Sequence, residues 1–504
     1  MFDLIINGFW EILHPVPLFL VFMGTFAGIV VGCIPGFTIT MGVALTLPLT
    51  FGMSSLHGLC IMLGVLVGGL AGGQISGILL GIPGTPASMP TMFDGYPLTQ
   101  QGKPGVALAT GTWASFIGGM LSGVALMFCT PPLANAALLF GPWEFFSMVV
   151  FGLTVIISLS GNALHKGAVS GLLGLFIACV GTDRVTSVPR FTFGITELTG
   201  DFAFLPVLVG LFAFSQLMSN LEVKTNLPYR DINKQYNLSF SNSAVLRDML
   251  RQKGNVIRSS VLGTLVGALP GAGGSIASVL CYDQAKKASP TPEKFGTGVT
   301  EGIVASESGN NATAGGSLAP MLALGVPGDA TAAIMMGALI LHGIQPGPEI
   351  VNKYPDLVYG VFAAFFIAHF FMLFLMLYGI RIFVHITRLP LYILVPCVLV
   401  LCAVGAFAVK NNFFDVWTLL IFGCLGYFMG KFKYPLAPFI LGIILAPLAE
   451  TSLVQAIQLS DDVSLFVTRP ISLALLLCAA FSLVYPFWQT YRSKKRKAAS
   501  CPPS

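Results

Sequence analysis

Long apolar runs separated by short polar segments set the pattern of this chain of 504 residues. A helix needs about 20 apolar residues to cross a membrane, and about twelve runs approach that length. The sequence therefore predicts an all-α polytopic membrane protein. The expected spans lie at 16–34, 38–52, 56–82, 105–130, 143–160, 167–182 and 202–220, from 259 onward, and near 330–343, 357–380, 390–409, 413–430, 435–450 and 470–488.

Two small-residue-rich apolar runs are interrupted by Pro-Gly pairs. Residues 81–84 read Gly-Ile-Pro-Gly, and residues 325–328 read Gly-Val-Pro-Gly. Proline lacks an N–H and glycine lacks a Cβ, so a helix is expected to break or re-enter at each pair. Broken backbone at membrane depth is tolerated only where it is buried in protein or lines a wet cavity. Matching breaks in two halves indicate a transporter's binding site, whereas either break alone would be an ordinary proline kink.

A second motif pair shows that the sequence repeats internally. GIVVGCIPG at 28–36 aligns with GTLVGALPG at 263–271, an offset of 235 residues, and the Pro-Gly breaks described above are 244 residues apart. The conserved order and spacing predict two repeated halves, inverted if the N-terminus lies outside. Loops rich in Lys and Arg stay in the cytoplasm. We therefore expect a transmembrane half at 1–220, a basic cytoplasmic linker at 221–258, a second transmembrane half at 259–490 and a basic cytoplasmic tail at 491–504.

Composition narrows the function further. Only 9% of the residues are charged and the mean hydropathy is +0.83, against about 25% charged in soluble domains. The ten cysteines form no CxxC pair and the six histidines show no metal spacing, so neither a resident cofactor nor a metal centre is expected. The net charge of +5 is not a nucleic-acid signature. GALPGAGGSIAS at 267–278 lacks the lysine of a phosphate loop, which argues against nucleotide binding and for an ion gradient or a partner as energy source.

Candidate site residues cluster at the breaks and in the polar segment 301–317. If that segment is helical, Glu307, Asn310 and Asn311 share one face. Polar groups at membrane depth usually mark a transport pathway, although helix–helix contacts are the alternative. Free N–H groups at broken helix ends suit an anion. The predicted substrate-binding residues are Gly84, Thr85, Pro86, Ser88, Asn310, Asn311, Gly328, Asp329 and Thr331. The predicted ion-coupling residues are Pro35, Gly36, Pro270, Gly271, Glu307 and Thr313.

Three long motifs resemble the large membrane subunit of the bacterial tripartite tricarboxylate transporters. They are IPGTPAS followed by FDGYPLTQQGKPG, the PGAGG segment, and ESGNNATAGGSLAPMLALGVPGDATAAIMMGALILHGIQPGPE. The resemblance covers about residues 20–430. It implies an importer of tri- or dicarboxylates in the bacterial inner membrane, coupled to transported Na⁺ or H⁺. It also implies two protein partners, a small four-helix membrane subunit and a periplasmic solute-binding protein.

Other classes of function remain as alternatives. A stand-alone secondary anion transporter would need no binding protein. A membrane-embedded enzyme would need a nucleophile, paired aspartates or a zinc motif within the membrane, and the sequence offers none of these. A passive channel is disfavoured because two polar breaks in one chain suit an occluded site better than a continuous pore.

Overall fold

The computed structural model describes residues 2–158, 164–183, 186–222, 238–386 and 391–484. Contacts divide the chain into two units, and each is described by itself. Unit 1 comprises Met1–Asn135 and Ala203–Tyr427, and unit 2 comprises Ala136–Phe202 and Phe428–Ser504. Each unit therefore draws on both predicted halves. Residues 223–237 of the predicted linker and the whole predicted tail lie outside the described residues.

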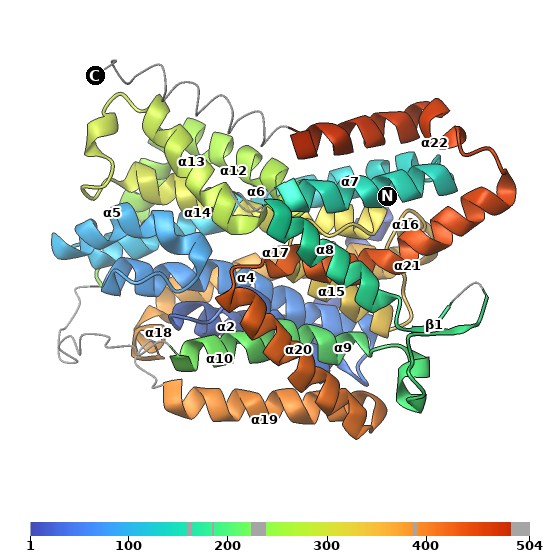
Figure 1. Cartoon of the computed structure of the whole chain (residues 1–504). Helices are drawn as coiled ribbons and strands as arrows, with labels where there is room; N and C mark the ends of the chain where they lie inside the picture. Colours follow the sequence, from blue (N-terminus) through green and yellow to red (C-terminus); the bar gives the residue numbers. More distant parts are fainter. Residues whose placement is uncertain (1, 159–163, 184–185, 223–237, 387–390, 485–504) are drawn as a thin grey trace, which may run out of the picture. The chain divides into compact units, whose positions relative to one another are not determined.

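Unit 1 is helical throughout its described part (Figure 1). Its elements up to the predicted linker are α1 (Phe2–Ile12), α2 (Pro15–Cys33), α3 (Ile39–Thr46), η1 (Leu47–Thr50), α4 (Ser55–Leu80), η2 (Pro86–Ser88), α5 (Met89–Gln100), α6 (Pro104–Ala137), α9 (Phe204–Val209), the π-helical η4 (Gly210–Phe214) and α10 (Ser215–Glu222). Its later elements are α11 (Asn242–Arg251), α12 (Lys253–Ala268), α13 (Gly273–Ala288), η5 (Pro292–Lys294), α14 (Thr300–Leu324), α15 (Ala330–Leu341), α16 (Ile350–Lys353), α17 (Pro355–Tyr378), α18 (Ile380–Ile386), α19 (Leu391–Lys410) and α20 (Phe413–Lys431).

Unit 2 combines apolar helices with a small β-hairpin. Its elements are α7 (Pro142–Ser158), α8 (Leu164–Ala178), β1 (Gly181–Thr182), β2 (Pro189–Arg190), η3 (Thr196–Gly200), α21 (Leu436–Leu459), α22 (Leu465–Thr468) and a last helix at 470–484. The strands pair antiparallel, with Gly181 opposite Arg190. Helix α21 packs against both α7 and α8.

The prediction of an all-α polytopic membrane protein is confirmed. In the part of the chain that the structure describes, seven helices are long and apolar enough to span a membrane, and six shorter helices are also apolar. The predicted ranges match the observed helices closely. Some polar stretches were not expected to be helical: α5 forms from the segment after the first break, and α11 and the start of α12 lie inside the predicted linker. The side on which any loop lies stays a prediction.

Two helix pairs in unit 1 repeat the same close packing. Helix α2 packs along α4, and α12 packs along α14 (Figure 1). In each pair, glycines bring one backbone against the carbonyl oxygens of the other, which is how small residues let membrane helices approach closely. The matched contacts are Gly28 with Val65 and Gly263 with Gly309, Gly32 with Gly69 and Gly267 with Thr313, and Gly72 with Ile29 and Gly316 with Thr264. They recur at the offsets of 235 and 244 residues, so the sequence repeat is also a packing repeat. Inversion of the repeat stays a prediction.

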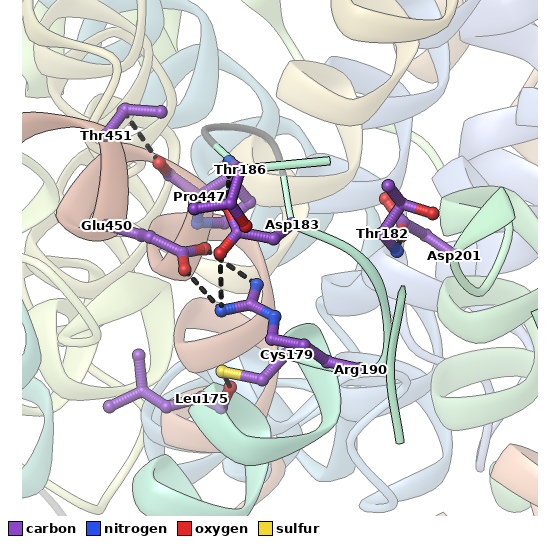
Figure 2. A network of polar contacts seen from close by, with 10 residues as sticks. All are labelled: Leu175, Cys179, Thr182, Asp183, Thr186, Arg190, Asp201, Pro447, Glu450 and Thr451. Atoms are coloured by element: carbon purple, nitrogen blue, oxygen red, sulfur yellow. Dashed lines mark hydrogen bonds and ion pairs between the residues drawn. The ribbon is translucent and has the colours of Figure 1, made fainter. Parts of the chain in front are cut away.

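The hairpin of unit 2 is joined to α21 by a charged network (Figure 2). The Arg190 guanidinium donates to both carboxylate oxygens of Glu450, at 2.6 and 3.2 Å. Its Nη1 also lies 3.5 Å from Asp183 Oδ2. The hydrogen bond to Glu450 is the main factor that raises the pKa of Arg190 above its ordinary value. The fork geometry of arginine matches a carboxylate in a way that lysine cannot.

Replacing Arg190 by lysine is expected to lower the free energy of unfolding of the purified protein by about 1 kcal/mol. The effect is small because the network is partly exposed. Lysine keeps the charge and loses the two-point contact, so Arg190→Lys and Arg190→Met should both be destabilised. The measurement is thermal unfolding in detergent. Lys287→Met, which removes an exposed pair with Asp283, is the control and should change little. An Arg190→Lys variant as stable as wild type would show that the fork geometry contributes nothing.

Candidate functional site

The two predicted breaks have the same backbone geometry. Helices α4 and α14 both end at a glycine in the left-handed region, Gly81 with φ 69° and Gly325 with φ 69°. The Gly81 N–H donates to Gly77 O, and the Gly325 N–H donates to Met321 O. A left-handed residue after the last turn is a common way to end a helix, and glycine adopts it without a Cβ clash. The predicted helix ends at these motifs are therefore confirmed.

The second glycine of each motif packs against the neighbouring helix of the same repeat. A Cβ on Gly84 would overlap the carbonyl oxygen of Gly32, and a Cβ on Gly328 would overlap that of Gly267. Both contacts are with backbone, which has little freedom to move. Each interruption is thus fixed against the end of the partner helix, α2 in one repeat and α12 in the other.

The residues that follow the two breaks differ in chemistry. Asp329 begins α15 as its N-cap, and its Oδ1 accepts from the Ala332 N–H at 2.7 Å. At the matching position, the Thr85 N–H donates to Ser88 Oγ at 3.3 Å, while Thr85 Oγ1 is buried without a partner. The α15 N-terminus is therefore satisfied by the chain's own carboxylate. This geometry favours a structural role for Asp329, whose predicted contact with an anion stays untested.

A third turn lies between the two interruptions. Helix α12 ends at Ala268, Pro270 and Gly271 form the turn, and α13 begins at Gly273. The Gly271 N–H donates to Gly328 O at 2.8 Å, which joins this turn to the second interruption. On its other side, a Cβ built on Gly274 would lie 3.4 Å from the Cβ of Ala87, which follows the first interruption. The sequence predicted one binding site from the two interruptions, and the α13 N-terminus contacts residues of both.

We call this meeting point the α13 cradle: Ala87, Gly273, Gly274, Asn310 and Thr313. The first-turn N–H groups of α13 have no acceptor within the helix, as at any helix start. Asn310 is fully buried, and its Nδ2 donates to Leu70 O of α4 at 3.2 Å. This bond fixes the amide orientation, so Asn310 Oδ1 points to the α13 start, 2.5 Å from a Cβ built on Gly274, and has no hydrogen-bond partner. The cradle therefore offers free donors and a free acceptor side by side.

A buried carboxyl group lies one helical turn before the cradle. Glu307 Oε1 is 2.6 Å from Thr91 Oγ1 of α5, and Oε2 is 2.9 Å from Ser115 Oγ of α6. Asn311 Nδ2 donates to the Glu307 carbonyl oxygen at 3.2 Å and approaches Oε2 at 3.4 Å. All these side chains are fully buried. Glu307 therefore ties three helices together.

The other predicted residues occupy the edges of this region. Gly36 has φ 90°, and its carbonyl oxygen already accepts from Asn220 Nδ2 at 2.9 Å. Thr331 Oγ1 on α15 lies 3.0 Å from Thr40 Oγ1 on α3, so the helix after the first Pro-Gly turn meets the helix after the second break. Thr313 Oγ1 donates to Asn310 O at 2.6 Å. Pro35 lies beside Gly36, and Pro86 begins η2.

Several buried polar side chains near the site were not predicted. Gln74, Ser76 and Ser308 are fully buried with side-chain atoms that have no partner. Gln74 and Ser76 could have been predicted, because they are polar residues inside the apolar run 56–82 and such groups are energetically costly at membrane depth. Within the described residues, no group of His, Cys, Asp and Glu is arranged to hold a metal ion.

Asp94 on α5 has a structural explanation. Its Oδ1 accepts from the N–H groups of Gly296, Gly298 and Val299 at 2.8–3.0 Å, and its Oδ2 accepts from Tyr282 at 2.9 Å. Gly296 and Gly298 have φ of 90° and 104°, which turns their N–H groups toward one oxygen. Asp94 thus fixes the loop that leads into α14.

Replacing Asp94 by alanine is expected to lower the free energy of unfolding by about 3 kcal/mol, because three backbone N–H groups lose a charged acceptor. Asp94→Asn keeps one oxygen and should cost about 1 kcal/mol. Thermal unfolding of the purified variants measures both. Asp283→Ala, at an exposed ion pair on α13, is the control. Equal stability of Asp94→Ala and this control would contradict the assigned role.

Fold and site together define a multi-pass membrane protein built from two packing repeats with interrupted helices. The family comparison agrees: residues 18–441 match the tripartite tricarboxylate transporter TctA family. The chain belongs to this family, as the resemblance predicted, and is thus a membrane subunit of a tripartite tricarboxylate transporter.

Two relatives come from Agrobacterium vitis. The chain is 36% identical over 501 residues, covering 99% of both chains, to the uncharacterized 52.8 kDa protein in the TAR-I ttuC′ 3′ region. It is 36% identical over 234 residues, 46% of this chain and 97% of the relative, to an uncharacterized protein in the TAR-II ttuC′ 3′ region. No solved structure matches.

Proposed function

We propose that the protein imports small organic di- or tricarboxylates across the bacterial inner membrane, driven by an ion gradient. In this proposal it forms the translocation path of a tripartite system with a periplasmic binding protein and a small membrane subunit. Family membership supports the general activity. The observation that carries the substrate-site assignment is the α13 cradle, where a helix start faces the unpartnered Asn310 Oδ1.

The chemistry of the cradle suits a carboxylate. A helix N-terminus carries a partial positive charge of roughly half an elementary charge and free N–H donors, which together stabilise an anion. The free acceptor, Asn310 Oδ1, suits a hydroxyl proton or a cation that accompanies the substrate. The breaks at Gly81 and Gly325 lie in low-charge sequence, so helix dipoles rather than lysine or arginine side chains would neutralise the carboxylate.

Transport through interrupted helices also has a physical basis. Such segments present backbone groups inside the membrane where regular helices cannot, and they converge at the midplane in many secondary transporters. Here the segments that follow α4 and α14 both reach the start of α13: Ala87 lies beside Gly274, and Gly328 O accepts from the Gly271 N–H. A shift of either repeat would open or close the cradle without breaking the close glycine contacts within each helix pair.

The test is uptake of labelled citrate and succinate by cells that express this chain with or without its two partner proteins, under imposed sodium or proton gradients. We expect concentrative uptake only with all three components and only with a gradient. Uptake by this chain alone would favour a stand-alone anion transporter. If the labelled carboxylate only equilibrates across the membrane and does not accumulate under any imposed gradient, ion coupling would be contradicted.

A further inference from the structure

Glu307 is a carboxyl group without a cation. It is 0% exposed, and no Lys, Arg or His in the described part of the chain forms an ion pair with it. Burying an ionised carboxylate away from water and without a counter-charge is strongly unfavourable. Its hydrogen bonds must therefore show whether the Glu307 carboxyl group carries a proton.

Those hydrogen bonds form a chain that needs one more proton than the hydroxyl groups supply. Glu307 Oε1, Thr91 Oγ1 and Ser306 Oγ follow one another at 2.6 and 2.9 Å, and Ser306 Oγ lies 2.9 Å from Gly302 O. These three short contacts need three protons, but the two hydroxyls carry only two. The count closes when the carboxyl group supplies the third: Glu307 donates to Thr91, Thr91 to Ser306, and Ser306 to the carbonyl oxygen.

The titratable groups on the packed elements do not change this count. On α12, Arg258 donates to Asn255 Oδ1 and not to Glu307. On α5, Asp94 is bound by backbone N–H groups and Tyr282. On α13, Cys281 lies against Gly309. On α17, His369 contacts α6 at Gly119, and its Nδ1 is bonded to Phe365 O. The α6 partner of Glu307 itself is the neutral Ser115.

We propose that Glu307 holds the transported coupling proton in a chain with Thr91 and Ser306, so that the gradient used is one of protons. This rests on the function proposed above and narrows its coupling ion. When Glu307 loses its proton, Thr91 must donate to the carboxylate and no longer to Ser306. The contact between α5 and α14 is thereby rewired. The helix α5 follows the first interruption, and Asn310 and Asn311 lie one turn after Glu307. Binding or loss of the proton at Glu307 therefore affects residues that adjoin the α13 cradle.

The direct test is infrared difference spectroscopy of the full-length protein in lipid bilayers during a pH titration. We expect a protonated-carboxyl C=O stretch at pH 7 that is absent from Glu307→Gln and unchanged by added sodium. Glu301→Gln, at the start of the same helix, is the matched control and should retain the band. A second variant, Thr91→Val, removes the acceptor and should move the band, which keeps the test valid if Glu307→Gln does not insert.

Three results would overturn the proposal. One is a wild-type spectrum without the band at pH 7. Another is a band that neither Glu307→Gln nor Thr91→Val changes. The third is loss of the band when sodium is added, which would make Glu307 a sodium ligand.

Uptake assays separate the proton assignment from the broader function. In the three-component system, Glu307→Gln should still exchange labelled citrate across the membrane but lose acceleration by a proton gradient, and retained acceleration would refute the coupling role. If no carboxylate is transported by wild type while the band behaves as expected, the proposed function fails and Glu307 is still a proton-binding group.

Discussion

Replacing Gly328 by alanine is expected to leave almost no folded protein in the membrane. Gly84→Ala should reduce the amount of folded protein nearly as much. A Cβ at either position overlaps a backbone carbonyl oxygen, of Gly267 or Gly32, and backbone cannot swing aside as a side chain can. Overpacking usually costs about 1–3 kcal/mol, and we expect the upper end here. The measurement is the yield of monodisperse protein after extraction, together with thermal unfolding of whatever is recovered.

Two glycines provide matched controls. Gly77 lies in α4 one turn before the break, and its added Cβ would meet its nearest neighbour at an ordinary 3.7 Å. Gly254 in α12 has nothing within 4 Å. Both alanine variants should fold at least as well as wild type, because alanine favours a helix over glycine. Normal yields of Gly328→Ala and Gly84→Ala would show that the interruptions are not packed as described.

Replacing Asn310 by alanine is expected to reduce carboxylate uptake at least about tenfold, a loss of roughly 1.4 kcal/mol in transition-state or substrate binding. The change removes the free Oδ1 acceptor at the α13 start and the bond from Nδ2 to Leu70 O. Uptake of labelled citrate, normalised to the amount of inserted protein, measures the effect.

The control for this variant is Asn352→Ala, an exposed asparagine on α16. It should transport normally. Asn311→Ala should have a smaller effect than Asn310→Ala. The Oδ1 atoms of both residues have no partner, but only that of Asn310 lies beside Gly274 at the α13 start. An Asn310→Ala protein that inserts normally and transports at the wild-type rate would remove Asn310 from the substrate site.

The sequence predicted the features that depend on local chemistry. Gly81 and Gly325 end helices because the proline two residues later cannot continue the hydrogen-bond pattern. The four residues of each motif are therefore enough to predict the helix end. The repeat was visible because the same small residues are needed wherever two helices touch through backbone. Gly32 and Gly267 are examples, at matching places in GIVVGCIPG and GTLVGALPG.

The features that were missed depend on pairs far apart in the chain. Thr91 and Glu307 are separated by 216 residues, and Ser115 and Glu307 by 192. No periodicity reports such a pair. Pro270 and Gly271 were among the predicted ion-coupling residues, but the sequence did not show that the α13 start would contact residues of both interruptions. The role of Asp94 could not be predicted either, because its three partners, at 296–299, become its neighbours only when α5 and α14 pack.

The division into units was also beyond sequence reasoning. The predicted halves follow the order of the repeat, whereas unit 2 takes α7 and α8 from one half and α21 from the other. Apolar runs show that a helix exists, but they do not show which other helix it packs against.

The most direct test of the central claim is the structure, by electron cryomicroscopy, of the full-length protein with its two partner proteins and saturating citrate. We predict density for a carboxylate within about 3 Å of the first-turn N–H groups of α13, beside Asn310 Oδ1 and Ala87. Citrate bound elsewhere in the chain, with the α13 cradle still closed around Gly274, would contradict the assignment.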